Sequence, residues 1–316
     1  MTECSERRLE SRAPDGRLLT AAFDGGPITS DGGLLLLREV EERCQILQRF
    51  GECFIDFRDQ ARVRHTTTEL ASQRVLALAL GYEDLVDHDH LRTDPLLAAS
   101  CGKRERRGEQ LASSATLGRI ENAAPGLAQD DRYRRILLDY EAVDHLLIDL
   151  FIEAHDAPPE EVILDLAATD ARIHGKQQGR FFHGYYDAYC FLPLYIFAGD
   201  HILGARLRRS NRDGAAGSVE ELERIVPRLR EAWPDVRIVV RGDSGFCREW
   251  LMAWCEAQHV AYVLGIARNA RLEDALNDAL DEARTLHCQT LRRSRVFDEF
   301  TYQTLDSWSK ARRVSG

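Results

Sequence analysis

The sequence predicts an α/β protein in which a sheet follows an all-helical first half. In the first half, apolar residues recur at helical spacing. The pair Pro158-Pro159 interrupts this pattern. Beyond the pair, the apolar pattern has the order three strands, helix, strand, helix, strand, helix. This order is typical of a mixed sheet with an antiparallel start and a parallel finish.

The composition is that of an ordinary soluble protein. The chain has 316 residues, of which 44% are hydrophobic and 30% are charged, so it can bury a sizeable core and hold two domains. No apolar run is long enough to cross a bilayer, and the N-terminus has no apolar signal segment. The eight cysteines are scattered, which fits thiols in a reducing compartment. We therefore expect a cytoplasmic protein without a membrane partner.

The N-terminal half divides into a tail and a helical region. Residues 1–22 are expected to be a disordered tail, and residues 23–157 a helical domain. Thr66 and Glu69 form a capping box for a helix that stops at Gly81. The other expected helices run to Gly51 after the start signals at residues 29–33, from Asp94-Pro95 to Gly102, from 114 to 122, and from 133 to 151.

The C-terminal half, residues 158–316, carries the strands. Those expected lie at residues 162–167, 185–197, 202–209, 236–240 and 260–266, with a turn at Gly199-Asp200. The helices expected between and after them begin near residues 218, 248 and 272. The segment 292–308 alternates like a strand.

Two of these strands carry an aspartate. Asp165 lies in EVILDLAATD (161–170), and Asp243 directly follows the run VRIVVRG (236–242). A strand-end carboxylate is exposed at the rim of an open α/β sheet, where such folds hold their sites. Each aspartate alone is explained by capping of a turn. Two of them in this strand order favour a site for Mg²⁺, which prefers oxygen ligands and supports phosphoryl transfer.

At these residues the sequence resembles the bacterial insertion-sequence DDE transposases, group 1. The resemblance runs from about Phe23 to the C-terminus. It rests on four segments: LDLAATD (164–170) with His174-Gly175, GRFFHGYYD (179–187), LRRSNRD (207–213) and RGDSGF (241–246).

The resemblance implies a ribonuclease-H-like mixed sheet flanked by helices, preceded by an all-α domain that binds transposon ends. It also implies three metal-binding acids, Mg²⁺ or Mn²⁺ as cofactor, and cut-and-paste DNA transfer. Double-stranded DNA would be the partner, both as transposon end and as target. A homodimer on DNA and an association with the nucleoid follow from the same resemblance.

The sequence departs from the family pattern at two places. The first acid of the family often lies in an Asp-x-Thr triplet, which here reads Ala167-Ala168-Thr169. Asp165 lies two residues earlier on the same strand face, and Asp170 directly follows. We expect Asp165 and Asp243 to hold the metal, with Asp170 as the alternative first ligand. The family's third acid is not in this chain, so we expect a catalytic domain that is incomplete at its C-terminus.

Arginines supply the expected DNA contacts. The best local basic patch consists of Arg206, Arg208, Arg209 and Arg212, although a solvated face explains it equally well. A second patch lies at residues 104–107. The net charge of −10 argues against a nonspecific nucleic-acid coat.

Three functions remain open at this stage. The first is a transposase that cleaves and transfers DNA strands. The second is a catalytically dead, truncated remnant that binds DNA or full-length partners without cutting. A ribonuclease-H-like nuclease unrelated to transposition is the weakest, because it has no use for so large a helical region.

Overall fold

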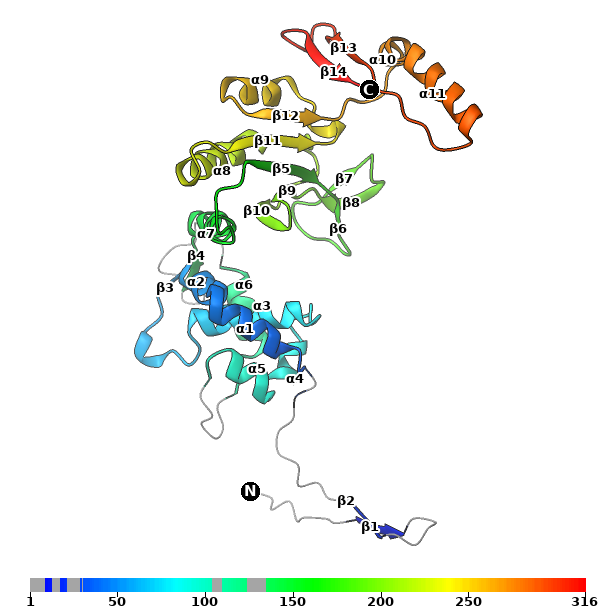
Figure 1. Cartoon of the computed structure of the whole chain (residues 1–316). Coiled ribbons are helices and arrows are strands. Elements are labelled where there is room, and N and C mark those ends of the chain that lie inside the picture. Colours follow the sequence, from blue (N-terminus) through cyan, green and yellow to red (C-terminus); the bar gives the residue numbers. More distant parts are fainter. Residues whose placement is uncertain (1–8, 13–17, 22–28, 30, 104–109, 124–134) are drawn as a thin grey trace. The chain divides into compact units, whose positions relative to one another are not determined.

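The computed structural model describes residues 9–12, 18–21, 29, 31–103, 110–123 and 135–316 (Figure 1). The chain forms two compact units, Met1–Leu146 and Leu147–Gly316. In the described part of the chain, no helix combines the length and the apolar character that a bilayer crossing needs.

The N-terminal segment contains two short strands, β1 (Leu9–Arg12) and β2 (Leu18–Ala21), which pair antiparallel. This hairpin differs from the disordered tail expected over residues 1–22. The rest of that tail lies outside the described residues.

The remainder of the first unit is mainly helical. The helices are α1 (Leu34–Cys44), α2 (Ile46–Glu52), α3 (Thr67–Ala79), α4 (Asp87–Leu91), α5 (Pro95–Ser100) and α6 (Ser114–Glu121), with a 3₁₀ turn, η1 (Gln60–Arg62). The capping box predicted at Thr66 and Glu69 is present, and Asp94 caps α5. The single helix expected up to Gly51 is divided at Gln45, whose φ is 51°.

The long helix expected over residues 133–151 is wrong in its first part. Residues Ile136–Leu138 form strand β4, which pairs antiparallel with β3 (Phe54–Asp56). Helix α7 starts only at Tyr140 and ends at Glu153. The reason is Asp139, whose carboxylate accepts the backbone N–H of Ala142 at 3.1 Å and so caps the helix at that point.

The second unit is built on a five-stranded sheet with the order β10-β9-β5-β11-β12. β9 is antiparallel to both β5 and β10, whereas β11 is parallel to both β5 and β12. Its strands are β5 (Glu161–Ala168), β9 (Leu194–Ala198), β10 (His201–Arg206), β11 (Arg237–Gly242) and β12 (Ala261–Leu264). The predicted α/β class, the antiparallel start and the parallel finish are confirmed. The strand order is that of the ribonuclease-H-like fold.

Two smaller sheets accompany the main one. β6 (Ala171–Arg172), β8 (Ala188–Phe191) and β7 (Phe181–His183) form one, and β13 (Glu299–Tyr302) pairs with β14 (Arg312–Ser315) in the other. The helices are α8 (Ser218–Ala232), α9 (Glu249–Ala257), α10 (Ala270–Ala275) and α11 (Asn277–Thr290), with a 3₁₀ turn, η2 (Ser244–Phe246).

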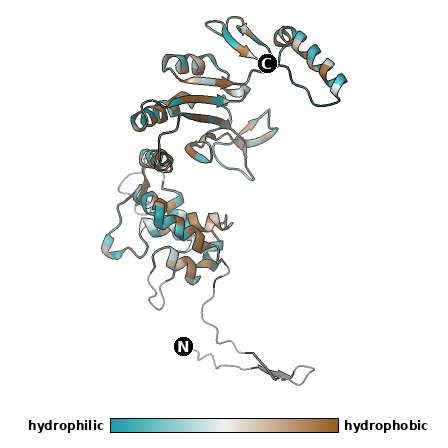
Figure 2. Cartoon of the chain, viewed as in Figure 1, coloured by the Kyte–Doolittle hydropathy of each residue, from teal (hydrophilic) through white to brown (hydrophobic). Residues whose placement is uncertain are grey.

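The main core lies on one face of the five-stranded sheet. Leu164 of β5 and Val240 of β11 are fully buried there, together with Leu222 of α8 and Leu251 of α9. Figure 2 shows the apolar character of these central strands. Because side chains alternate along a strand, Asp165 and Arg241 point to the opposite face.

Candidate active site

Asp165 lies beside Arg241 in the parallel pair of β5 and β11, where the two residues are register partners. The Arg241 guanidinium donates two hydrogen bonds to the Asp165 carboxylate, Nε to Oδ1 and Nη2 to Oδ2, the second at 2.6 Å. This hydrogen-bonded pair raises the pKa of Arg241. Both carboxylate oxygens of Asp165 are therefore occupied by a cation of the protein itself.

Asp243 directly follows β11 and is exposed. Its Oδ1 accepts the backbone N–H of Gly245 at 2.7 Å, which caps the 3₁₀ turn η2. A side chain at Gly245 would meet that same oxygen. Within the described part of the chain, Oδ2 of Asp243 has no hydrogen-bond partner, so one oxygen of this carboxylate can bind a ligand.

In the register of β5 and β11, Arg241 pairs with Asp165 and Gly242 with Leu166. Asp243 is the first residue after β11, and continuing the same register by one position would place it opposite Ala167. Strand spacing and rise put the Cα atoms of Asp165 and Asp243 about 8 Å apart. Ala167, which replaces the aspartate of the family's Asp-x-Thr triplet, is thus at the position where a second carboxylate would be nearest to Asp243.

Asp170 lies just beyond β5, and within the described residues one of its carboxylate oxygens has no partner. Its Oδ2 accepts a hydrogen bond from Arg172 Nε at 2.9 Å, and its side chain is 20% exposed. Burial raises the pKa of the nearby Tyr186 hydroxyl, and the charges of Asp170 and Asp243 both raise it further. The two carboxylates therefore act on the same hydroxyl at the end of the sheet.

The four motif segments meet at this end of the sheet. The Tyr186 hydroxyl donates to the carbonyl of Ala168 at 3.4 Å, which joins the second segment to the first. Ser210 of the third segment donates to the Phe181 carbonyl at 2.9 Å. Arg248, just after the fourth segment, forms an ion pair with Asp213 at 2.9 Å. Nδ1 of His183 is buried without a hydrogen-bond partner, and its ring lies 4.9 Å from that of Tyr186.

The carboxylates only partly match a metal site. Within the described ranges, no three histidine, cysteine, aspartate or glutamate side chains are grouped closely enough to hold a metal ion. Mg²⁺ is nevertheless often bound by one or two carboxylates, with water and substrate phosphates as the other ligands. Within the described residues, Asp243 and Asp170 each keep one carboxylate oxygen without a hydrogen bond, whereas both oxygens of Asp165 are taken by Arg241.

Two of the four arginines expected to contact DNA have other partners. Arg206 donates to Glu221 at 2.6 Å. Arg208 is buried, and its guanidinium donates to the carbonyls of Leu192, Gly214 and Ala216.

Because Arg208 is buried and held by these three carbonyls, it does not fit the expected role of a surface contact to phosphate. Arg209 and Arg212 are exposed. The second patch, at residues 104–107, lies outside the described residues.

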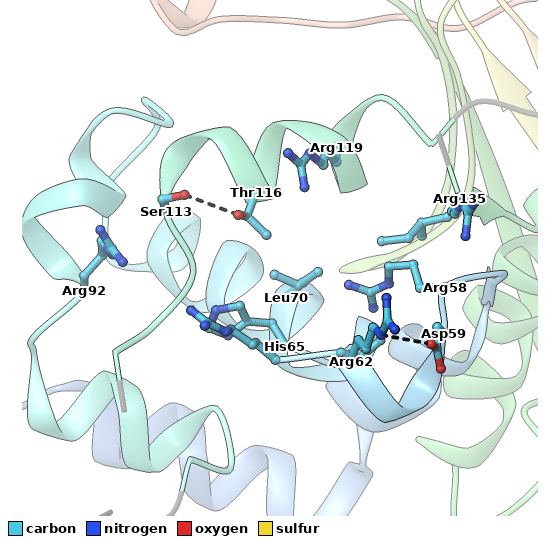
Figure 3. A pocket seen from close by; sticks show the side chains of 13 residues that line it. Arg58, Asp59, Arg62, His65, Leu70, Arg92, Ser113, Thr116, Arg119 and Arg135 are labelled. Atoms are coloured by element: carbon cyan, nitrogen blue, oxygen red, sulfur yellow. Dashed lines mark hydrogen bonds and ion pairs between the residues drawn. The ribbon is translucent and has the colours of Figure 1, made fainter. Parts of the chain in front are cut away.

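A basic pocket in the first unit has no counterpart among the predicted sites (Figure 3). Arginines line it, and they come from widely separated positions: Arg58, Arg62, Arg64, Arg92, Arg119 and Arg135. Only Arg62 and Arg64, with His65 beside them, are close enough in sequence to have been noticed as a basic cluster.

The family of the chain follows from a comparison with protein-family models. The model described as "Transposase DDE domain group 1" matches residues 12–315. The chain belongs to this transposase family. The predicted resemblance to the DDE transposases, group 1, is thereby confirmed. No curated protein is similar enough in sequence to match the chain.

Solved transposase structures are similar at low sequence identity. The piggyBac transposase synaptic complex with hairpin DNA has 9% identity and a TM-score of 0.38, over 89% of this chain and 60% of that one. The catalytic domain of Mos1 mariner transposase has 10% identity and a TM-score of 0.25, over 54% and 78%. The Mos1 paired-end complex has 13% identity and a TM-score of 0.23, over 89% and 83%. This transposase-family chain thus spans 60% of the length of the piggyBac transposase chain.

Proposed function

We propose that this chain is a DNA-cutting transposase of an insertion sequence. It binds the terminal inverted repeats through its helical unit and cleaves and transfers DNA strands at the β5–β11 end of its sheet. The observation that carries the proposal is the position of Asp243. It is exposed, it has a free carboxylate oxygen, and it follows a strand that is parallel to the aspartate-bearing β5.

Asp243 is the anchor of the proposed metal site, and Asp170 is its best partner. The support for Asp170 is its action, together with Asp243, on the Tyr186 hydroxyl. Asp165, favoured by the sequence, would first have to exchange Arg241 for the ion. When bound, Mg²⁺ or Mn²⁺ activates a water and offsets the charge that develops on the phosphate.

The chain's own residues would hold the DNA strand for this chemistry. Arg209 and Arg212 are the exposed cations of the expected basic patch and could contact backbone phosphates. The Tyr186 hydroxyl, which lies near both Asp170 and Asp243, could hydrogen-bond the phosphate or its water. Action as a dimer on two DNA ends, in the nucleoid, completes the proposal and rests on the family alone.

The test is strand cleavage of a matched transposon end with and without Mg²⁺, comparing the native chain with Asp243→Asn. A lost metal contact is worth several kcal/mol, so cleavage should fall about 100-fold or more. The control is Asp200→Asn, in the exposed turn between β9 and β10, which should cleave normally. Equal cleavage by Asp243→Asn and the native chain would refute the assignment.

A second candidate is a family member that binds DNA without cutting it. The observations that favour it are Ala167 opposite Asp243 and the pairing of Asp165 with Arg241. The same assay separates the two functions. A chain that still binds the transposon end specifically, but cleaves it in neither Mg²⁺ nor Mn²⁺, would support this second candidate.

A further inference from the structure

The helical unit contains a pocket of about 680 Å³, a volume typical of ligand-binding pockets. Its apolar base includes Leu70 of α3 and Ile136 of β4, which are 0% and 5% exposed. Around this base the lining is basic, and Figure 3 shows arginine side chains directed around the pocket from several elements. They lie in and around η1, before α3, after α4, in α6 and before β4.

The charge of this pocket is strongly unbalanced. Among the described residues, its lining contains six arginines and one carboxylate, Asp59. Asp59 is 3.4 Å from Arg62 Nε, and both side chains are well exposed. Arg58 is matched by Asp56, to which it donates two hydrogen bonds at 2.8 and 2.7 Å. Arg92 donates to a backbone carbonyl, that of Leu111.

Three of the arginines have no partner for their side chains among the described residues. Within the described part of the chain, the guanidinium groups of Arg64, Arg119 and Arg135 make neither a hydrogen bond nor an ion pair, and all three residues are exposed. The net charge of the chain is −10, so its carboxylates outnumber the lysines and arginines with which they could form ion pairs. A cluster of unpaired guanidiniums around one cavity is instead typical of an anion site.

His65 reports the positive potential of the pocket. Burial lowers the pKa of His65, and the charges of Lys103, Arg58 and Arg92 lower it further, while Glu69 acts in the opposite direction. A bound anion would reverse the effect of the cations. The imidazole is thus an internal probe for the occupation of this pocket.

The lining also limits what kind of contact the pocket can make. Among the described residues that line it there is no phenylalanine, tyrosine or tryptophan, so these residues offer no platform for the stacking of bases. Arginine forks match phosphate oxygens well. The cavity is larger than one phosphate group requires, which leaves room for neighbouring phosphates of one strand.

We propose that this pocket of the helical unit binds backbone phosphates of DNA and positions the DNA without reading its sequence. The inference rests on the proposed function for the identity of the polyanion. Arg119 and Arg135 form the central contacts, and Arg64 and Arg62 form the rim.

The experiment measures binding of the full chain to two duplexes of equal length and unrelated sequence, by fluorescence anisotropy over a range of salt concentrations. Each phosphate contact contributes about 0.9 to the slope of log affinity against log salt. Arg119→Gln with Arg135→Gln should therefore flatten the slope by about two and weaken binding about 10- to 100-fold. The loss should be equal for both duplexes.

The matched control is Arg38→Gln with Arg43→Gln on α1, which removes the same charge from the same unit away from the pocket. Arg119 and Arg135 have no described partners, so their double variant should melt at or above the native temperature. The pocket is excluded as a DNA site if its double variant keeps the native slope, or loses no more affinity than the control pair.

A second readout follows the His65 ring by NMR. The duplex should raise the pKa of His65 in the native chain and not in the pocket variant. A rise with inorganic phosphate alone, and none with duplex, would overturn the proposal in favour of a small-anion site. If the chain binds DNA through the pocket but does not cut it, the proposed function is refuted and the pocket proposal stands.

If the chain cuts DNA and the variant without Arg119 and Arg135 binds DNA as tightly as the native chain, only the pocket proposal is refuted.

Discussion

Arg312 shows at the scale of one residue how the second unit is held together near its C-terminus. Its side chain is 5% exposed and lies between Glu249 and Glu256 of α9, with bonds of 2.7 Å to each. Its guanidinium also lies over the ring of Trp308, 5.5 Å from the centroid. Hydrogen bonding to Arg312 is the largest effect that lowers the pKa of Glu256, to about 2.

Replacing Arg312 with methionine should be costly, because two partly buried carboxylates lose their shared guanidinium, and Glu256 keeps only the ion pair with Lys310. We expect the free energy of unfolding of the second unit to fall by about 3 kcal/mol. All four tryptophans lie in this unit, at positions 233, 250, 254 and 308, so urea unfolding followed by tryptophan fluorescence measures it. Arg313→Met, one residue away, is the control. Its ion pair with Glu299 is exposed, so the change should be far smaller.

The triad of Arg312, Glu249 and Glu256 also predicts how the stability of the second unit responds to acid. The pKa of Glu256 is about 2 in the folded chain and close to its ordinary value, 4.5, in the unfolded chain. Its contribution is therefore complete above pH 4.5 and is lost as the pH falls toward 2. Tryptophan-detected urea unfolding from pH 6 to pH 2.5 should show a weaker loss of stability in Arg312→Met than in the native chain. Parallel losses would contradict this role of the triad.

At the scale of elements, the parallel pair of β5 and β11 determines what the site can bind. In its register, Asp165 is the partner of Arg241. The same register, continued one position beyond Gly242, would place Asp243 opposite Ala167. A carboxylate at position 167 would therefore be the nearest neighbour of Asp243 across the sheet.

Ala167→Asp should create a stronger cation site. We expect Mn²⁺ affinity, measured by calorimetry, to rise about tenfold or more, since hard cations favour added carboxylates. Without metal, the two like charges should lower the melting temperature, and Mn²⁺ should restore it. Ala167→Asn has the same shape without the charge and is the control. Equal affinities for the two variants would show that position 167 does not face the ion.

Local signals in the sequence were enough for most of these elements. The capping box of Thr66 and Glu69, Asp94-Pro95 and the turn at Gly199-Asp200 act within a few residues, and each is present as predicted. Strand β4 was missed because its three residues gain their structure only by pairing with β3, far away in the chain.

The missed parts of the candidate site depend on long-range contacts. The pair of Asp165 and Arg241 spans 76 positions, and local pattern cannot reveal it. The basic pocket gathers arginines from residues 58 to 135, so the basic cluster at residues 58–65 contains only half of them. Arg208 looked like a surface cation, yet three carbonyls surround its guanidinium.

At the scale of the whole molecule, the two units carry chemically different sites. The first unit has a cluster of arginines with one carboxylate among the described residues around it. The second has the exposed Asp243 and the half-buried Asp165 and Asp170 at the end of its sheet. For a member of the DDE transposase family, this division agrees with our proposal that one unit holds DNA and the other cleaves it. The account depends most on the cation at Asp243.

Anomalous diffraction from crystals soaked in Mn²⁺ tests that claim most directly. We predict a manganese peak about 2.0–2.6 Å from a carboxylate oxygen of Asp243, with Asp170 or a rearranged Asp165 as its neighbour, and no such peak in Asp243→Asn. A map in which manganese binds elsewhere, while Asp243 has no metal contact and Arg241 still holds Asp165, would contradict the proposed active site.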